Sequence, residues 1–80
     1  MIEALLECKK VTCEKLANLL SKFRGTFAKE FKVWLRDKSV FAYFKVASIP
    51  DLNEFTKRLE MKKIEFKYRS IKKVLPHEGL

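Results

Sequence analysis

Alternating apolar and polar residues mark the beginning of the chain. Ile2, Ala4, Leu6 and Cys8 take every second position, and Glu3, Leu5, Glu7 and Lys9 lie between them. A period of two residues predicts a strand with one face in the core. Because Ala, Leu, Glu and Lys also favour helices, one continuous helix over residues 2–24 is the alternative interpretation.

The next segment, residues 13–23, has apolar residues at helical spacing. Apolar residues recur there every three or four positions, at Cys13, Leu16, Ala17, Leu20 and Phe23. Thr12 is a good N-cap and Gly25 a good stop signal, so we expect a helix over residues 13–24.

Two further alternating segments, residues 27–36 and 40–46, predict a β-hairpin. A tight turn at Asp37 and Lys38 pairs apolar residues on the core face: Leu35 with Val40, Val33 with Ala42 and Phe31 with Phe44. On the other face the same register pairs Trp34 with Phe41, Lys32 with Tyr43 and Glu30 with Lys45. Both faces are chemically matched, which supports the register.

The second half of the chain predicts one more helix and one more strand. Ser48, Pro50 and Asp51 are typical of a helix start, and Leu52, Phe55 and Leu59 form its buried stripe. After Met61, Ile64, Phe66 and Tyr68 alternate with charged residues, as in a strand.

The predicted order is β-α-β-β-α-β. We therefore expect an α+β protein with a ferredoxin-like split sandwich, an antiparallel sheet carrying two helices on one face. Its 80 residues allow one domain, over residues 1–75, with a flexible tail at 76–80.

Composition favours a folded chain outside the membrane. Hydrophobic residues make up 48% and charged residues 35% of the sequence. No stretch approaches the ~18 to 20 apolar residues of a membrane span, and no signal-peptide pattern is present. We expect a soluble, cytoplasmic protein.

The net charge of +8 is concentrated toward the C-terminus. The basic residues between positions 57 and 73, here called the basic stripe, are Lys57, Arg58, Lys62, Lys63, Lys67, Arg69, Lys72 and Lys73. Such a stripe attracts the RNA backbone through counterion release. The alternative is that lysine-rich surfaces only keep the protein soluble.

The uncovered sheet face is the second candidate site, for base stacking or for a protein partner. The register gathers aromatic residues there among cations: Lys32, Trp34, Arg36, Phe41, Tyr43 and Lys45. Aromatic rings among cations suit unpaired RNA bases and their phosphates. Residues 41–46 resemble the first ribonucleoprotein motif of RNA-recognition domains. The alternatives are that another subunit covers this face, or the chain's own tail through Ile71, Val74 and Leu75.

Little in the sequence points to catalysis. The single histidine, His77, lies near the tail, and Cys8 and Cys13 are too few for a structural zinc site. We expect both cysteines to be small packing residues, and a non-enzymatic protein without metal or cofactor.

Residues 2–59 are similar to the small dimerising subunit of the KEOPS tRNA-modifying complex. The likeness lies in the strand from Ile2, the helix around Leu16 to Phe23, the hairpin with Leu35, Lys38, Val40 and Lys45, and the polar turn at 48–51 before Leu52, Asn53 and Leu59. The resemblance implies a non-catalytic subunit that pairs with itself or a related subunit and docks through its helices onto the catalytic subunit making threonylcarbamoyl-adenosine in tRNA.

Two functions follow as hypotheses. The first is an accessory subunit of an RNA-modifying complex, dimeric and contributing basic surface for tRNA. The second is a stand-alone or ribosome-associated RNA-binding module that uses the aromatic sheet face.

Overall fold

The computed structural model describes residues 1–23 and 27–73, and of residues 27–29 only the backbone. The elements follow the predicted order β-α-β-β-α-β. They are β1 (Ile2–Lys9), α1 (Cys13–Lys22), β2 (Phe27–Arg36), β3 (Ser39–Val46), α2 (Ile49–Met61) and β4 (Glu65–Lys73).

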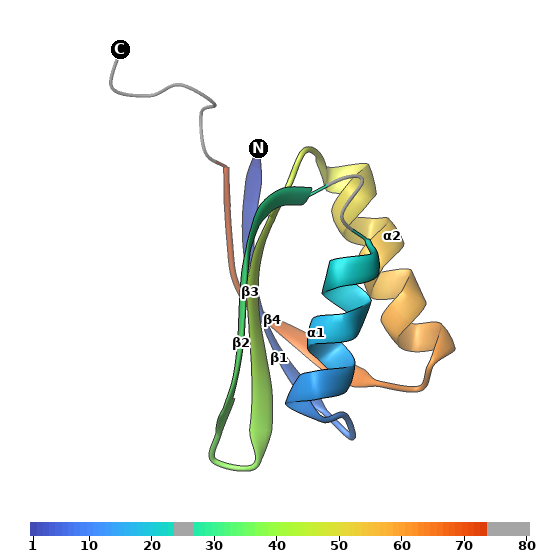
Figure 1. Cartoon of the computed structure of the whole chain (residues 1–80). Coiled ribbons are helices and arrows are strands. Elements are labelled where there is room, and N and C mark those ends of the chain that lie inside the picture. The colour runs from blue at the N-terminus through green and yellow to red at the C-terminus, as the bar shows by residue number, and fades with distance from the viewer. Residues whose placement is uncertain (24–26, 74–80) are drawn as a thin grey trace.

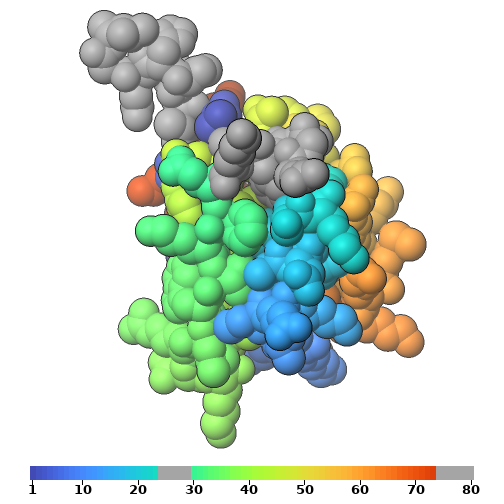
Figure 2. All heavy atoms as spheres, in the orientation of Figure 1, coloured from blue at the N-terminus to red at the C-terminus, as the bar shows by residue number. Residues whose placement is uncertain are grey.

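The four strands form one antiparallel sheet in the order β2-β3-β1-β4. Both helices lie on the same side of the sheet, as the ribbon in Figure 1 shows. In the space-filling view the side chains of α1 lie directly against those of the β2–β3 hairpin (Figure 2). The expected ferredoxin-like split sandwich is confirmed, and within residues 1–23 and 27–73 no helix lies on the opposite side of the sheet.

The first strand and first helix are separate, so the single helix over residues 2–24 is wrong. Lys10 adopts a φ of 65°, which turns the chain out of the strand direction. The Thr12 hydroxyl then accepts a hydrogen bond from the backbone N–H of Lys15, 3.1 Å away, and caps α1 as predicted. The helix ends at Lys22, and the predicted stop at Gly25 lies outside the described residues.

Helix α2 begins with a hydrogen bond between two side chains and ends in a backbone capping motif. Ser48 occupies the N-cap position, but its hydroxyl donates to the Asp51 carboxylate, 3.1 Å away, and accepts no capping hydrogen bond from a backbone N–H of the helix. At the other end Lys63 has a φ of 60°. The N–H of Ile64 donates to the carbonyl of Leu59, and the N–H of Lys63 donates to the carbonyl of Glu60. Both donor–acceptor distances are 3.0 Å. This pair of bonds is a Schellman motif, which turns the chain into β4.

The predicted hairpin register is confirmed from Phe31 to the turn. It shifts between Phe27 and Phe31, so the predicted pairing of Glu30 with Lys45 lies outside the regular ladder. Cα partners run from Phe31↔Phe44 to Arg36↔Ser39, with Trp34 opposite Phe41 and Lys32 opposite Tyr43. The turn residues Asp37 and Lys38 have φ values of 51° and 69°. Two successive positive φ angles are typical of a type I′ turn, whose twist matches that of the two strands.

The core lies between the helices and the sheet. Its largest members are Phe44, Phe55, Leu6, Leu16, Leu20, Leu52 and Leu59, all fully buried. Phe44 packs edge-on against Phe55 with the ring centroids 5.1 Å apart, which joins the central strand β3 to α2. Leu35, expected in the core, is 67% exposed, because it lies next to the projecting hairpin turn.

A register shift in the β1–β4 pair changes which residues of β4 share a face. Leu6 pairs with Tyr68 but Leu5 pairs with Ser70, so Arg69 is the extra residue of a bulge. Beyond the bulge Ile71 pairs with Ala4 on the helix side of the sheet. Ile71 therefore does not cover the uncovered face, and Val74 and Leu75 lie outside the described residues.

Candidate nucleic-acid interface

The sheet face opposite the helices, here called the open face, is organised in rows across the strands. One row contains Trp34, Phe41, Glu7 and Lys67, and the next contains Lys32, Tyr43, Leu5 and Ser70. A third row adds Lys45, Glu3 and Lys72. The alternation along each strand puts these side chains on one side, because successive residues point to opposite faces. The open face therefore combines aromatic, basic and acidic groups.

Trp34 and Phe41 form the aromatic centre of this face. Their rings stack across β2 and β3 with centroids 5.8 Å apart and planes 10° from parallel. Trp34 is still 37% exposed, so the outer part of the indole is accessible to a ligand. Tyr43 is half-buried, and desolvation raises the pKa of its hydroxyl, with the Glu3 carboxylate acting in the same direction. The hydroxyl therefore remains a neutral donor at physiological pH.

The sequence prediction of the site omitted two acidic residues on β1. The Ser39 hydroxyl donates a 2.7 Å hydrogen bond to Oε2 of Glu7, and Arg69 Nε lies 3.6 Å from Oε1 of the same carboxylate. The hydrogen bond from Ser39 is the main cause that lowers the Glu7 pKa, and Arg69 and Lys67 add to it. Glu3 lies 3.9 Å from Lys45 Nζ. The alternation along β1 already indicates that Glu3 and Glu7 lie on this side of the sheet. Only the pairing of β1 with its neighbouring strands shows that these carboxylates contact Lys45, Ser39 and Arg69.

The cations of the open face differ in how far they are neutralised. Lys45 is half-buried and lies 3.9 Å from both Glu3 and Glu30. Arg36 is 3.9 Å from Asp37, and both side chains are highly exposed. Within the described parts of the chain, no carboxylate is at ion-pair distance from Lys32, Lys67 or Lys72. These three lysines surround the aromatic rows and are available to an anionic ligand.

The basic stripe does not form one surface. Lys57 and Arg58 lie on α2, where Arg58 pairs with Glu54 at 3.1 Å and its guanidinium sits 4.7 Å from the centre of the Phe23 ring. Lys62 and Lys63 form the turn after α2. Strand β4 carries Lys67, Arg69 and Lys72 on the open face, whereas Lys73 pairs with Ile2 on the helix side. The stripe is thus divided between the two sides of the sheet, and only its β4 part adjoins the aromatic residues.

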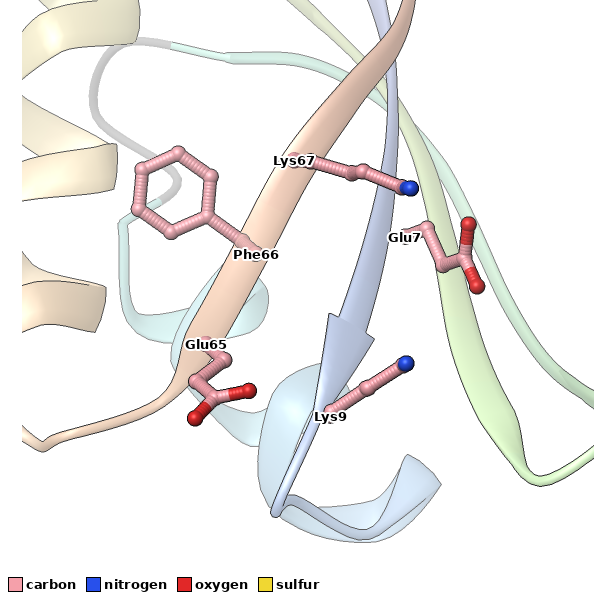
Figure 3. Close-up of a pocket in the computed structure, with 5 residues that line it drawn as sticks. All are labelled: Glu7, Lys9, Glu65, Phe66 and Lys67. Carbon is pink, nitrogen blue, oxygen red and sulfur yellow. The ribbon is translucent and has the colours of Figure 1, made fainter.

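Glu7 separates two hollows of the surface. The smaller, of about 140 Å³, is lined by Glu7, Lys9, Glu65, Phe66 and Lys67. In Figure 3 Lys9 and Lys67 project from neighbouring strands toward the side where Glu7 lies, and the Phe66 ring points the opposite way, toward the helix layer. The larger hollow, of about 290 Å³, is lined by Glu7, Arg36, Asp37, Phe41 and Arg69. It brings arginines from the two edge strands to one carboxylate and one aromatic ring.

Other chemistry is sparse in the described part of the chain. Cys8 is buried, Cys13 is half-buried, and both thiols are free. Burial raises the pKa of the Cys8 thiol to about 11, which fits a packing role and not a nucleophilic one. Among residues 1–23 and 27–73, no three His, Cys, Asp or Glu side chains gather as metal ligands, and no helix is long and apolar enough to cross a bilayer.

No protein-family model matches this chain, and no curated protein matches its sequence.

Proposed function

We propose that this protein binds single-stranded RNA on the open face of its sheet, without catalysing a reaction itself. The observation that carries the proposal is the position of Trp34 and Tyr43 on that face, with Lys32, Lys67 and Lys72 around them. Exposed bases stack on aromatic rings, and lysines that no carboxylate neutralises hold phosphates.

Charge supports an anionic ligand of this kind. The chain carries +8 overall, and the acids Glu3 and Glu7 on the open face are already paired with Lys45, Ser39 and Arg69. These contacts partly neutralise the two carboxylates and so reduce, without removing, their repulsion of the phosphates of a bound strand. Counterion release adds an affinity that falls as the salt concentration rises.

The chain offers an internal reporter of binding. Trp34 is the only tryptophan, and it lies within the proposed surface. Titration of the protein with a short uridine-rich RNA should quench its emission, because the base stacks on the indole. Anisotropy of a fluorescein-labelled copy of the RNA gives an independent affinity. Trp34→Ala should weaken that affinity by ~1 to 3 kcal/mol, as expected for the loss of one stacked base.

A matched pair of charge reversals tests which side of the molecule is used. Lys67→Glu and Lys57→Glu change the net charge equally, but Lys67 lies on the open face and Lys57 on α2. Lys67→Glu should lower both the affinity and its dependence on salt, whereas Lys57→Glu should have a smaller effect. Equal effects of the two variants, or no quenching of Trp34, would contradict binding at the open face.

A second candidate is an accessory subunit of a KEOPS-like RNA-modifying complex, paired with a related subunit. One observation favours a protein partner: a hollow of about 500 Å³ between α1 and α2, lined by Leu19, Lys22, Arg58, Met61 and Lys62. Met61 is 79% exposed there. Affinity purification from the native host should then recover a tRNA-modifying ATP-binding enzyme, and Met61→Glu should abolish that recovery while leaving RNA binding intact. Recovery of the chain alone or with ribosomes contradicts this candidate.

A further inference from the structure

The larger hollow beside Glu7 has a composition that general RNA backbone binding does not require. A surface that only holds phosphates has no use for a carboxylate at its centre, because that carboxylate repels them. Here Glu7 lies in the middle of a row, between Phe41 and Lys67. Arg36 and Arg69 flank it from the two outer strands.

The hydrogen-bonding capacity of Glu7 is only partly used. An ionised carboxylate offers about four lone-pair positions. Among the described residues the hydroxyl of Ser39 takes one of them on Oε2, and Arg69 Nε lies 3.6 Å from Oε1. The Arg69 contact is an ion pair too long for a hydrogen bond, so about three positions remain, at least one on each oxygen. These two contacts favour the ionised carboxylate and orient it. The Glu7 side chain is 17% exposed and lines both hollows.

Two free positions on a carboxylate suit a pair of adjacent N–H donors. Guanine presents two such donors, N1–H and the N2 amino group, side by side on its Watson–Crick edge. In adenine and cytosine the amino group is next to a ring nitrogen that accepts, and in uracil the N3–H lies between two carbonyls. These ring nitrogens and carbonyls are hydrogen-bond acceptors, so they repel a carboxylate oxygen instead of donating to it. Guanine is thus the one common base that satisfies both oxygens of Glu7.

The size and walls of the hollow fit one nucleotide. Its volume of about 290 Å³ lies just below the range for drug-sized small-molecule sites, roughly 300 to 1,000 Å³, which suits a ligand as small as one base. Phe41 supplies an aromatic wall that is half-buried, and Arg36 and Arg69 lie where phosphates flanking the base are within reach. Arg36 is only weakly engaged, at 3.9 Å from the exposed Asp37.

We infer that this hollow binds an unpaired guanine of the RNA, with the Glu7 carboxylate accepting from N1–H and N2–H and the two arginines holding adjacent phosphates. The inference rests on the proposed function and gives it a base preference. Glu7 is the specificity residue, and Arg36 and Arg69 contribute to affinity for every sequence.

The experiment compares heptamer RNAs on the full chain by anisotropy at constant salt. The first is all uridine, and the others carry guanine, inosine, adenine or cytosine at the centre. The guanine heptamer should bind about tenfold tighter than the uridine heptamer, within the roughly 5- to 150-fold range of one bidentate base contact. Inosine lacks the N2 amino group, so it should lose most of this preference.

Two variants locate the contact. Glu7→Gln replaces one acceptor oxygen by a donor and should remove the guanine preference while uridine-heptamer binding is retained or improves. Glu3→Gln makes the same charge change on the same strand and face and should keep the preference. Thermal melts verify that both variants are folded.

The outcomes separate the two proposals. Binding of all heptamers with equal affinity, or a guanine preference that survives in Glu7→Gln, overturns the guanine site and leaves RNA binding on the open face standing. Failure of the wild-type chain to bind any heptamer overturns the proposed function itself.

Discussion

Replacing Lys38 by glycine should stabilise the protein. Lys38 is the second central residue of the β2–β3 turn and has a φ of 69°. This left-handed conformation costs a residue with a Cβ about 1–2 kcal/mol, whereas glycine adopts it without that steric cost. Glycine also loses more backbone entropy on folding, by about 0.5–1 kcal/mol. The net gain expected for Lys38→Gly is therefore about 0.5–1 kcal/mol.

The gain is measurable by thermal denaturation. In a domain of this size 1 kcal/mol corresponds to a change in Tm of about 4–8 °C, so Lys38→Gly should raise Tm by about 2–8 °C. Chemical denaturation should show a higher midpoint with an unchanged slope. Lys63 at the end of α2 has a φ of 60° and offers a second position at which the same reasoning predicts a similar gain.

Two controls separate backbone strain from charge. Lys38→Ala removes the same positive charge but keeps a Cβ, so its Tm should change little. Lys32→Gly lies on β2, outside the residues with positive φ, and should destabilise by about 0.5–1 kcal/mol. If Lys38→Ala raises Tm as much as Lys38→Gly does, relief of charge repulsion explains the gain and the strain argument is refuted.

Three further predictions concern the core and the titrating groups. Phe44→Ala should lower the free energy of unfolding, measured by chemical denaturation, by ~3–5 kcal/mol, because Phe44 is fully buried against Phe55. Phe41→Ala on the open face should lower it by only ~1 kcal/mol. Equal losses would contradict the assignment of the two faces. Burial raises the pKa of Cys8 from 9.0 to about 11, so the stability contributed by its neutral thiol is complete below pH 9 and is lost as the pH rises toward 11. Cys8→Ala should show a shallower decline over that interval, and an identical decline would argue against a buried thiol. The pKa of Glu7 is lowered from 4.5, chiefly by the Ser39 hydroxyl, so its contribution is present above that value and is lost as the pH falls. Denaturation curves of Glu7→Gln should therefore depend less on pH below 4.5 than those of the wild type, and parallel pH profiles would refute the Glu7–Ser39 link.

Much of the fold could be predicted because the chain repeats its local signals consistently. The hairpin is the clearest case: a tight turn at Asp37 and Lys38 sets a register that pairs apolar with apolar residues, and that register is observed from Phe31 to the turn. Thr12 and Ser48 were recognisable as helix starts for the same local reason, since a short polar side chain precedes an apolar stripe. Leu35 was misplaced because alternation gives the face of a residue but not whether a helix reaches that far.

The candidate site was predictable only in part. Trp34, Phe41 and Tyr43 could be assigned to one face from the hairpin alone. Their acidic neighbours on β1 could not be predicted as part of the site without knowing that β1 pairs with both β3 and β4. This pairing brings Ser39 and Arg69 to Glu7 from 32 or more residues away in the chain. The basic stripe was predicted as one surface, yet the turn after α2 divides it between the helix layer and β4.

The sequence by itself determined the elements, their order and the apolar side of each strand, because periodicity and caps act between residues that are neighbours in the chain. Only the tertiary structure decided the sheet order, the bulge at Arg69 and the meeting of Arg36, Glu7 and Arg69 around one hollow. Those features depend on long-range strand pairing, in which one extra residue in β4 changes the face to which every later side chain points.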